Sequence, residues 1–184
     1  MNECTYRLQT DDVNAFLSSS VVANAKKIYA HARDKQILST NEMCEARDYL
    51  ITLISLKTGT EPGALENLKT KEYFEAKEDP VTGHKVLLVP QHKRQSNGPA
   101  PLSLDDELHK LFDIYVKYIH PQFPTPRGDT IFLRNDGTSF QEGTINKRLP
   151  EFCRKSRVRP DLRITATNIR KFIVTICNQK KRRD

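Results

Sequence analysis

The sequence predicts an α+β domain that is mostly α-helical and includes a small three-stranded antiparallel sheet. Apolar residues recur at spacings of three and four through most of the chain, which is the period of helices with one buried face. Three short runs of strand-forming residues, at 70–76, 85–89 and 100–104, are separated by turn-forming segments. At 184 residues, the chain has the length of one domain with a substantial core.

The composition is that of a globular protein, with 37% hydrophobic and 29% charged residues. No apolar run is as long as a membrane span, and the first residues lack a signal-peptide pattern. We therefore expect an intracellular protein, nuclear or cytoplasmic, without membrane contact. Cys4, Cys44, Cys153 and Cys177 form no CxxC pair or Cys/His metal spacing, so we expect reduced thiols, no bound metal and no other cofactor.

Positive charge is concentrated near the C-terminus. Residues 145–184 contain 13 Lys and Arg against 3 Asp and Glu, whereas the preceding residues contain 17 against 20. A basic quarter on a near-neutral body is the pattern of a protein that binds a phosphate backbone. A solvated surface or, for residues 180–183, a localisation signal is the alternative interpretation.

The first half of the chain begins with two short helices, around Phe16 and around Ala25, which we interpret as a helical linker or N-terminal extension covering residues 1–38. A domain at 39–184 follows. Ser39 and Glu42 form an S-x-x-E capping box at the start of a helix that Gly59 is placed to end. Pro62 then begins a short helix.

The three strands form a predicted meander. The turn sequence DPVTG at 79–83 joins the first two strands, and a polar loop at 91–99 joins the second to the third. Lys93 and Arg94 lie at the mouth of that second turn. An exposed basic hairpin tip without a specific function is the alternative for these two residues.

A helix is predicted at 105–119, a short strand at 130–133 and a second helix at 140–157. Pro150 lies inside the second helix and should kink or split it, because proline removes an interior hydrogen bond. The helix directs a group of cations outward, either toward a ligand or simply toward solvent: Lys147, Arg148, Arg154, Lys155 and Arg157.

The last predicted helix covers residues 164–176. Thr165 or Thr167 can cap its start, and apolar residues from Ile169 onward fall on one face. Arg170 and Lys171 lie in its first two turns, where the helix dipole favours an anion such as phosphate. In the alternative interpretation, Arg170 pairs with a carboxylate of the protein and Lys171 faces solvent.

The segment TATNIRK at 165–171 resembles the second catalytic box of tyrosine recombinases (the phage integrase family), which usually reads T-P-H-D-L-R-H. Arg170 matches the arginine of the box, and Thr167 stands in the place of its histidine. The segment TGTEPGALENL at 58–68 resembles the first box, T-G-x-R-x-x-E-L-x-x-L, with Glu61 in the place of the catalytic arginine. Lys93 is the better match to the lysine that this family carries on its β-hairpin, and Arg94 is the second.

This resemblance covers residues 39–178 and implies a tyrosine recombinase-like catalytic domain, incomplete at its C-terminus and closest in character to transposon-derived recombinases. It implies a role related to DNA recombination and integration, with DNA as partner and a homo-oligomer on DNA left open. Through it we expect DNA contacts from eight cations: Lys93, Arg94, Lys147, Arg148, Arg154, Lys155, Arg170 and Lys171.

Members of the family cut DNA with a tyrosine hydroxyl, assisted by two arginines, a lysine and histidine-type donors. Here Glu61 and Thr167 replace two of these groups, and the last tyrosine, Tyr118, stands in the wrong part of the order. We therefore interpret Arg170 and Lys93 as vestigial catalytic positions and expect DNA binding without strand cleavage by this chain alone.

Two alternatives stay open. The chain is a fragment of an active recombinase whose tyrosine lies beyond residue 184, or it is a protein-interaction module with a basic surface. The family interpretation makes one demanding prediction, that Lys93, Arg94, Arg170 and Lys171 share a single basic cleft.

Overall fold

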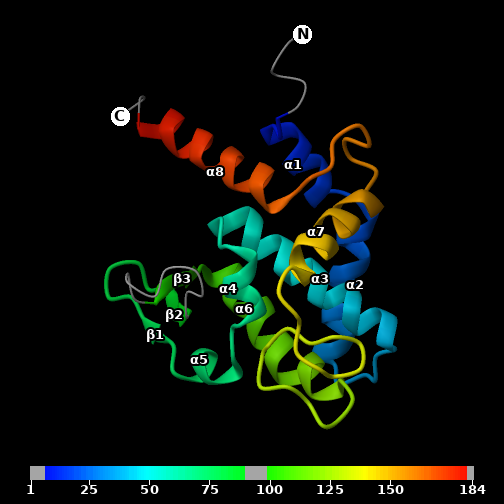
Figure 1. Cartoon of the computed structure of the whole chain (residues 1–184). Helices are drawn as coiled ribbons and strands as arrows, with labels where there is room; N and C mark the ends of the chain where they lie inside the picture. The colour runs from blue at the N-terminus through cyan, green and yellow to red at the C-terminus, as the bar shows by residue number, and fades with distance from the viewer. Residues whose placement is uncertain (1–6, 90–98, 182–184) are drawn as a thin grey trace.

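Helices form most of the chain in the computed structural model, which describes residues 7–89 and 99–181 (Figure 1). The helical elements, in chain order, are α1 (Thr10–Leu17), α2 (Ser20–Arg33), α3 (Thr40–Thr58), α4 (Pro62–Glu66), α5 (Thr70–Phe74), α6 (Asp106–Ile114), a π-helical turn η3 (Tyr115–Ile119), a 3-10 turn η4 (His120–Gln122), α7 (Thr144–Lys155) and α8 (Ala166–Lys181).

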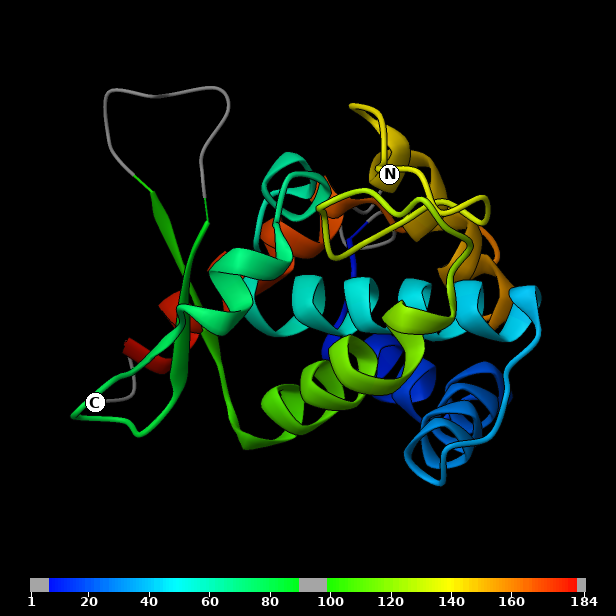
Figure 2. The same ribbon diagram turned by 90° about the horizontal axis from the view of Figure 1, so that it is seen from below.

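The long helix α3 lies at the centre of the fold. It packs against α2, α6, α7 and α8, and Figure 2 shows it crossing the molecule with α6 on one side and α7 on the other. Its buried positions, from Met43 to Ser55, extend around the helix rather than along a single stripe. A helix surrounded in this way is the framework on which the other elements are positioned.

Local signals set the ends of α3. The Ser39 side chain accepts from the Glu42 backbone N–H at 3.3 Å, and the Glu42 carboxylate accepts from the Ser39 N–H at 2.7 Å. These bonds also lower the pKa of Glu42. Gly59 ends the helix with φ +66°, a left-handed conformation that glycine adopts without strain. The predicted capping box and helix end are therefore confirmed.

The sheet is three-stranded and antiparallel in the order β1 (Lys77–Glu78), β2 (Lys85–Val89), β3 (Ala100–Leu104), as predicted in type and order. The register pairs Lys85 with Leu104 and Val89 with Ala100. Alternate residues of the strands face the core, because successive strand side chains point to opposite faces; the buried ones are Leu87, Val89, Leu102 and Leu104.

The predicted first strand at 70–76 is wrong. Residues 70–74 form α5, and β1 covers only residues 77 and 78. Tertiary contacts outweigh the strand propensity of Tyr73, because its ring stacks on Phe112 at 5.2 Å and its hydroxyl donates to Asp113 at 2.7 Å. The segment at 130–133 likewise forms only isolated bridges, of Thr130 with Lys69 and Leu133 with Ser139, instead of the predicted strand.

Helix α7 is shorter than predicted, whereas helix α8 extends further toward the C-terminus than predicted. Pro150 lies inside α7 and is buried, and the helix continues through it from residue 144 to residue 155 rather than splitting. Helix α8 extends to residue 181, with Ile169 fully buried and Phe172 and Ile173 packed at the edge of the core.

The N-terminal segment packs on the same core. Val22, Ala25 and Ile28 of α2 are buried within it. Arg159, in the loop before α8, pairs with Asp12 of α1 at 3.1 Å. These contacts join α1 and α2 to the rest of the described chain, while a division at residue 38 stays a prediction.

Candidate functional site

The N-terminus of α8 is built by a reciprocal cap. The Thr165 hydroxyl accepts from the Asn168 backbone N–H at 3.2 Å, and the Asn168 side-chain oxygen accepts from the Thr165 N–H at 3.0 Å. The cap is therefore Thr165, the first of the two predicted candidates. Thr167 is the second residue of α8 and is exposed.

Arg170 meets Glu61 at the side of this helix. Their side chains form an ion pair with Nη2 and Oε1 3.0 Å apart, and the two side chains are 48% and 61% exposed. Glu61 stands where the first box usually carries an arginine. Its carboxylate here pairs with Arg170, the arginine of the second box. The Glu61 carboxylate, which alone would repel a phosphate, has its charge balanced by Arg170.

The turn between α3 and α4 holds the two boxes together. A β-carbon added to Gly59 would lie 3.3 Å from Ile173 Cδ1 and 3.9 Å from Arg170 Cγ, so the turn lies directly against α8. The Thr58 hydroxyl donates to the Ile54 carbonyl and lies 2.6 Å from the Thr60 hydroxyl, which stiffens the same turn.

Helix α7 carries four of the predicted DNA-binding cations, and they divide into two kinds. Lys147, Arg154 and Lys155 are exposed, and no ion pair engages them within the described residues. Arg148 instead donates hydrogen bonds to the Asp48 carboxylate from two guanidinium nitrogens, Nη2 at 2.7 Å and Nε at 3.1 Å. This hydrogen bonding raises the pKa of Arg148.

Asp48 belongs to a buried charge network in which Arg47 is its second partner. The Arg47 side chain is 1% exposed, donates from Nε to Asp48 at 2.9 Å and from Nη1 to the Leu133 carbonyl at 2.6 Å, and lies over the Phe140 ring. The network ties α3 to α7 and to the 130–133 segment. Sequence reasoning did not identify Asp48, and no local spacing marks it.

Glu66 is a second carboxylate that sequence reasoning missed. It is 2% exposed and accepts from the backbone N–H groups of Gly143 at 3.1 Å and Ile145 at 2.8 Å. Glu66 therefore caps the start of α7 from α4, as an acidic group at a helix N-terminus should. The sequence placed Glu66 in the short helix predicted from Pro62 but gave no sign of its partners.

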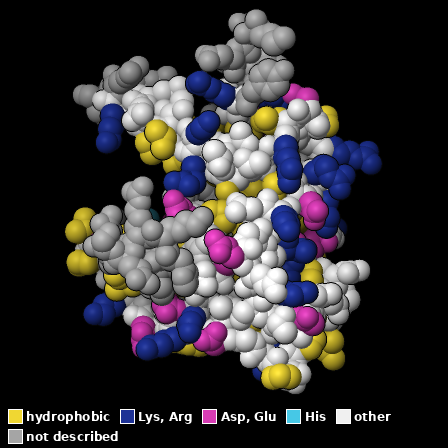
Figure 3. All heavy atoms as spheres, viewed as in Figure 1, with side chains coloured by type: hydrophobic (Ala, Val, Ile, Leu, Met, Phe, Trp, Pro, Cys, Tyr) yellow, Lys and Arg dark blue, Asp and Glu magenta, His cyan; other side chains and the backbone are white. Residues whose placement is uncertain are grey.

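One face of the molecule carries many of the cations. Figure 3 shows Lys and Arg side chains over α8 and over α7 on this face, with acidic side chains scattered among them. Arg170 and Lys171 lie on α8. Lys93 and Arg94 lie outside the described residues, so the cleft predicted for all four stays a prediction.

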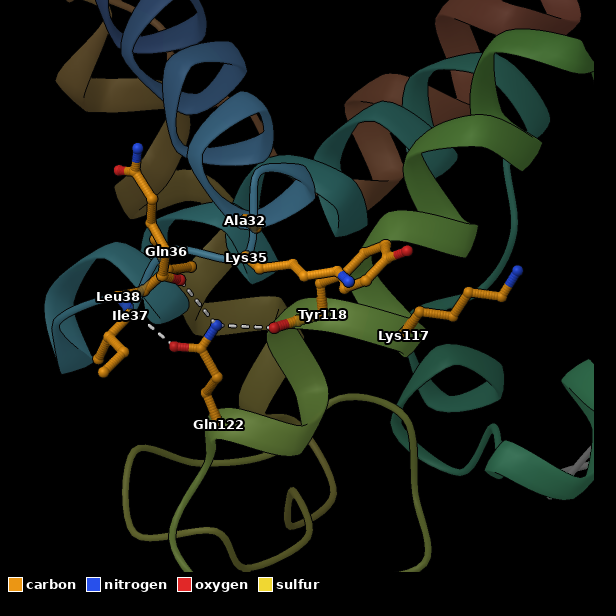
Figure 4. A pocket seen from close by; sticks show the side chains of 8 residues that line it. All are labelled: Ala32, Lys35, Gln36, Ile37, Leu38, Lys117, Tyr118 and Gln122. Atoms are coloured by element: carbon orange, nitrogen blue, oxygen red, sulfur yellow. Dashed lines mark hydrogen bonds between the residues drawn. The ribbon is translucent and has the colours of Figure 1, made fainter.

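A separate hollow of about 440 Å³ lies where α2 meets α3 and η3 (Figure 4). The Gln122 amide closes it, accepting from Leu38 N–H at 2.8 Å and donating to the Tyr118 carbonyl at 2.7 Å. The hollow lies near the beginning of α3, whereas Glu61 and Arg170 meet just beyond the end of α3. No cluster of metal-ligating side chains occurs in the described part of the chain.

No tyrosine nucleophile was found beside Arg170 within residues 7–89 and 99–181. Tyr29, Tyr49 and Tyr115 are buried and therefore inaccessible to a DNA phosphate. Their burial also raises the pKa of Tyr49 to about 12 and raises those of Tyr29 and Tyr115. Tyr118 lines the hollow at the opposite end of α3. The buried Cys153 thiol, with its pKa raised to about 12, is equally inert.

Comparison with known proteins gives a match in structure and none in sequence. No family model and no curated protein sequence matches the chain. The XerA recombinase crystal structure matches with a TM-score of 0.58 at 18% identity, over 95% of this chain and 50% of that one.

Two structures of the XerH site-specific recombinase match as well. XerH bound to difH substrate, in a pre-cleavage complex, gives a TM-score of 0.65 at 17% identity, over 96% of this chain and 44% of that one. The post-cleavage complex on palindromic difH gives 0.64 at 17% identity, over 98% of this chain and 44% of that one.

The chain therefore has a tyrosine recombinase-like fold, which confirms the predicted fold class. It spans about half the length of the recombinases that it matches. None of the helices in its described residues is both long and apolar enough to cross a membrane.

Proposed function

We propose that this tyrosine recombinase-like domain binds DNA through its phosphate backbone, using the exposed cations of α7 and α8. The observation that supports it most directly is the recombinase fold over nearly the whole chain, combined with the cations over α7 and α8 on one face. The XerH recombinase of the same fold is solved on its difH substrate.

The proposed contact residues are ordered by their availability. Lys147, Arg154, Lys155 and Lys171 are exposed and would contact phosphate directly. Arg170 would contribute after releasing Glu61, and Arg148 would contribute least because Asp48 holds its guanidinium. Lys93 and Arg94 remain proposed contacts from the loop between β2 and β3. Contacts of this kind position a protein on DNA without reading its sequence.

The same proposal holds that this chain alone does not cleave DNA. Glu61 and Thr167 stand where the family has arginine and histidine, and burial keeps Tyr29, Tyr49 and Tyr115 out of reach of a DNA phosphate. The nuclear location, the transposon origin and assembly into a homo-oligomer on DNA remain predictions.

A second candidate is that the domain forms part of an active recombinase whose nucleophile lies elsewhere in a longer protein. The observation that favours it is the match to only 44–50% of the solved recombinases. Reading the gene beyond codon 184 for a further box with a tyrosine tests this candidate directly.

The binding test is fluorescence anisotropy of a labelled duplex titrated from about 25 to 300 mM salt. Release of about 0.9 counterions per contact makes affinity fall linearly with log salt. Arg170→Ala should weaken binding and reduce the slope by about one contact. Lys110→Ala on α6, which also removes an exposed cation, is the matched control. Binding that is insensitive to salt would instead favour the protein-interaction module.

A nicked suicide substrate on a denaturing gel tests cleavage. We expect no covalent protein–DNA adduct from this chain. An adduct would contradict the non-cleaving interpretation and reveal a nucleophile among the remaining tyrosines.

A further inference from the structure

Glu61 places a carboxylate where an anion would bind Arg170. The ion pair joins Oε1 to Nη2 at 3.0 Å, and Arg170 forms no other ion pair within the described residues. Carboxylate and phosphate oxygens accept the same charge-assisted hydrogen bonds from a guanidinium. The two ligands therefore compete for one donor group.

The carboxylate of Glu61 is not needed to build its own helix. Glu61 stands at the N-cap position of α4, yet its side chain makes no capping bond. The start of α4 is held instead by the Glu61 backbone carbonyl, which accepts from Ala64 N–H at 3.0 Å and Leu65 N–H at 3.3 Å, with Pro62 in the first turn. The side chain is thus free to serve the contact with α8.

The turn beside the pair is closely packed against α8, but the pair itself is accessible. Gly59 lies against the Arg170 stem and Ile173, which sets the separation of α4 and α8. Both charged groups are about half exposed, so water and ions reach them. An exposed ion pair of this kind is weakly held and can exchange partners without movement of the backbone.

We propose that Glu61 is an internal competitor that occupies an oxyanion site formed by Arg170, and that a DNA phosphodiester binds there by displacing it. The ligand class is a phosphate oxyanion, taken from a DNA backbone or from a free phosphate. The proposal rests on the proposed function in one respect, since it assigns the displacing anion to DNA. The wild-type chain is then a weaker DNA binder than its cations alone would make it.

A double-mutant cycle tests the mechanism. Glu61→Gln should tighten duplex binding by about tenfold at 0.1 M salt and leave the salt slope close to that of the wild type, since Arg170 contacts one phosphate in both bound states. In an Arg170→Ala background the same substitution should give no more than the general gain expected from the loss of one negative charge. An equal gain in both backgrounds would overturn the proposal, because it would show a general effect of net charge.

The matched control is Glu151→Gln on α7, which removes an exposed carboxylate that is not paired with Arg170. Its effect measures the general gain from one lost negative charge. The gain from Glu61→Gln must exceed it.

A second readout does not use DNA. Inorganic phosphate is titrated while the Arg170 Nε–Hε signal is followed by NMR. The signal should move at lower phosphate concentration in Glu61→Gln than in the wild type, and an identical response in both would overturn the proposal. If no variant binds DNA but phosphate still distinguishes the two proteins, the proposed function fails while the oxyanion site stands. If DNA binding depends on Arg170 but not on Glu61, the proposed function stands while the proposed role of Glu61 fails.

Discussion

The fold contains two arginine–carboxylate pairs around α3 that share one chemistry and differ in burial. Arg148 binds Asp48 at the middle of α3, where the Asp48 side chain is 7% exposed and Arg47 adds a second guanidinium. Arg170 binds Glu61 just past the end of α3, where both groups are about half exposed. Excluding water from the first pair makes it part of the framework, whereas water around the second leaves it exchangeable.

The strongest test of this difference is Asp48→Asn. Removing the carboxylate leaves Arg47, whose side chain is 1% exposed, without its counterion in a buried place, and takes the partner from Arg148, which is 37% exposed. The loss should lower the free energy of unfolding by about 3–5 kcal/mol. Urea denaturation measures it. Glu61→Gln, the matched loss of an exposed partner, should cost less than about 1 kcal/mol. Equal losses in the two variants would remove the distinction between the pairs.

Glu66→Ala sharpens the comparison within one short helix. Glu61 and Glu66 lie at opposite ends of α4, but Glu66 is buried and satisfies two N–H groups of α7. Leaving these donors unsatisfied should cost about 2–3 kcal/mol. Hydrogen exchange of the Ile145 amide should also be faster in Glu66→Ala than in the wild type. An unchanged Ile145 amide would show that Glu66 does not cap α7.

The smallest expected effect concerns pH. Burial lowers the pKa of His120, whose Nε2 lies 3.1 Å from the Thr130 carbonyl. The unfolded chain therefore binds more protons than the folded one below about pH 6.5, and the free energy of unfolding should fall as pH is lowered from 7 to 5.

His120→Gln should flatten this part of the pH profile of stability. The exposed His31, replaced by Gln, is the control and should leave the profile unchanged. Carboxylates with lowered pKa values, such as Asp105 and Asp113, lose their contribution at lower pH and do not disturb this window.

Sequence alone was sufficient where the deciding contacts are local. The Ser39–Glu42 cap and the predicted cap at Thr165 both act over three positions of the chain. Gly59 ends α3 through its own backbone conformation. Helical periodicity and turn chemistry likewise yielded the fold class and the order of the strands, because both act over a few residues.

Only the tertiary structure decided the partners of the charged groups. Arg148 and Arg170 look alike in sequence, as exposed cations of predicted helices. Packing places one against buried Asp48 and the other against Glu61, each about a hundred residues away along the chain. Residues 70–74 became helical for the same reason, since the stacking of Tyr73 on Phe112 outweighs local propensity. Such choices depend on distances between elements, which no local pattern of residues encodes.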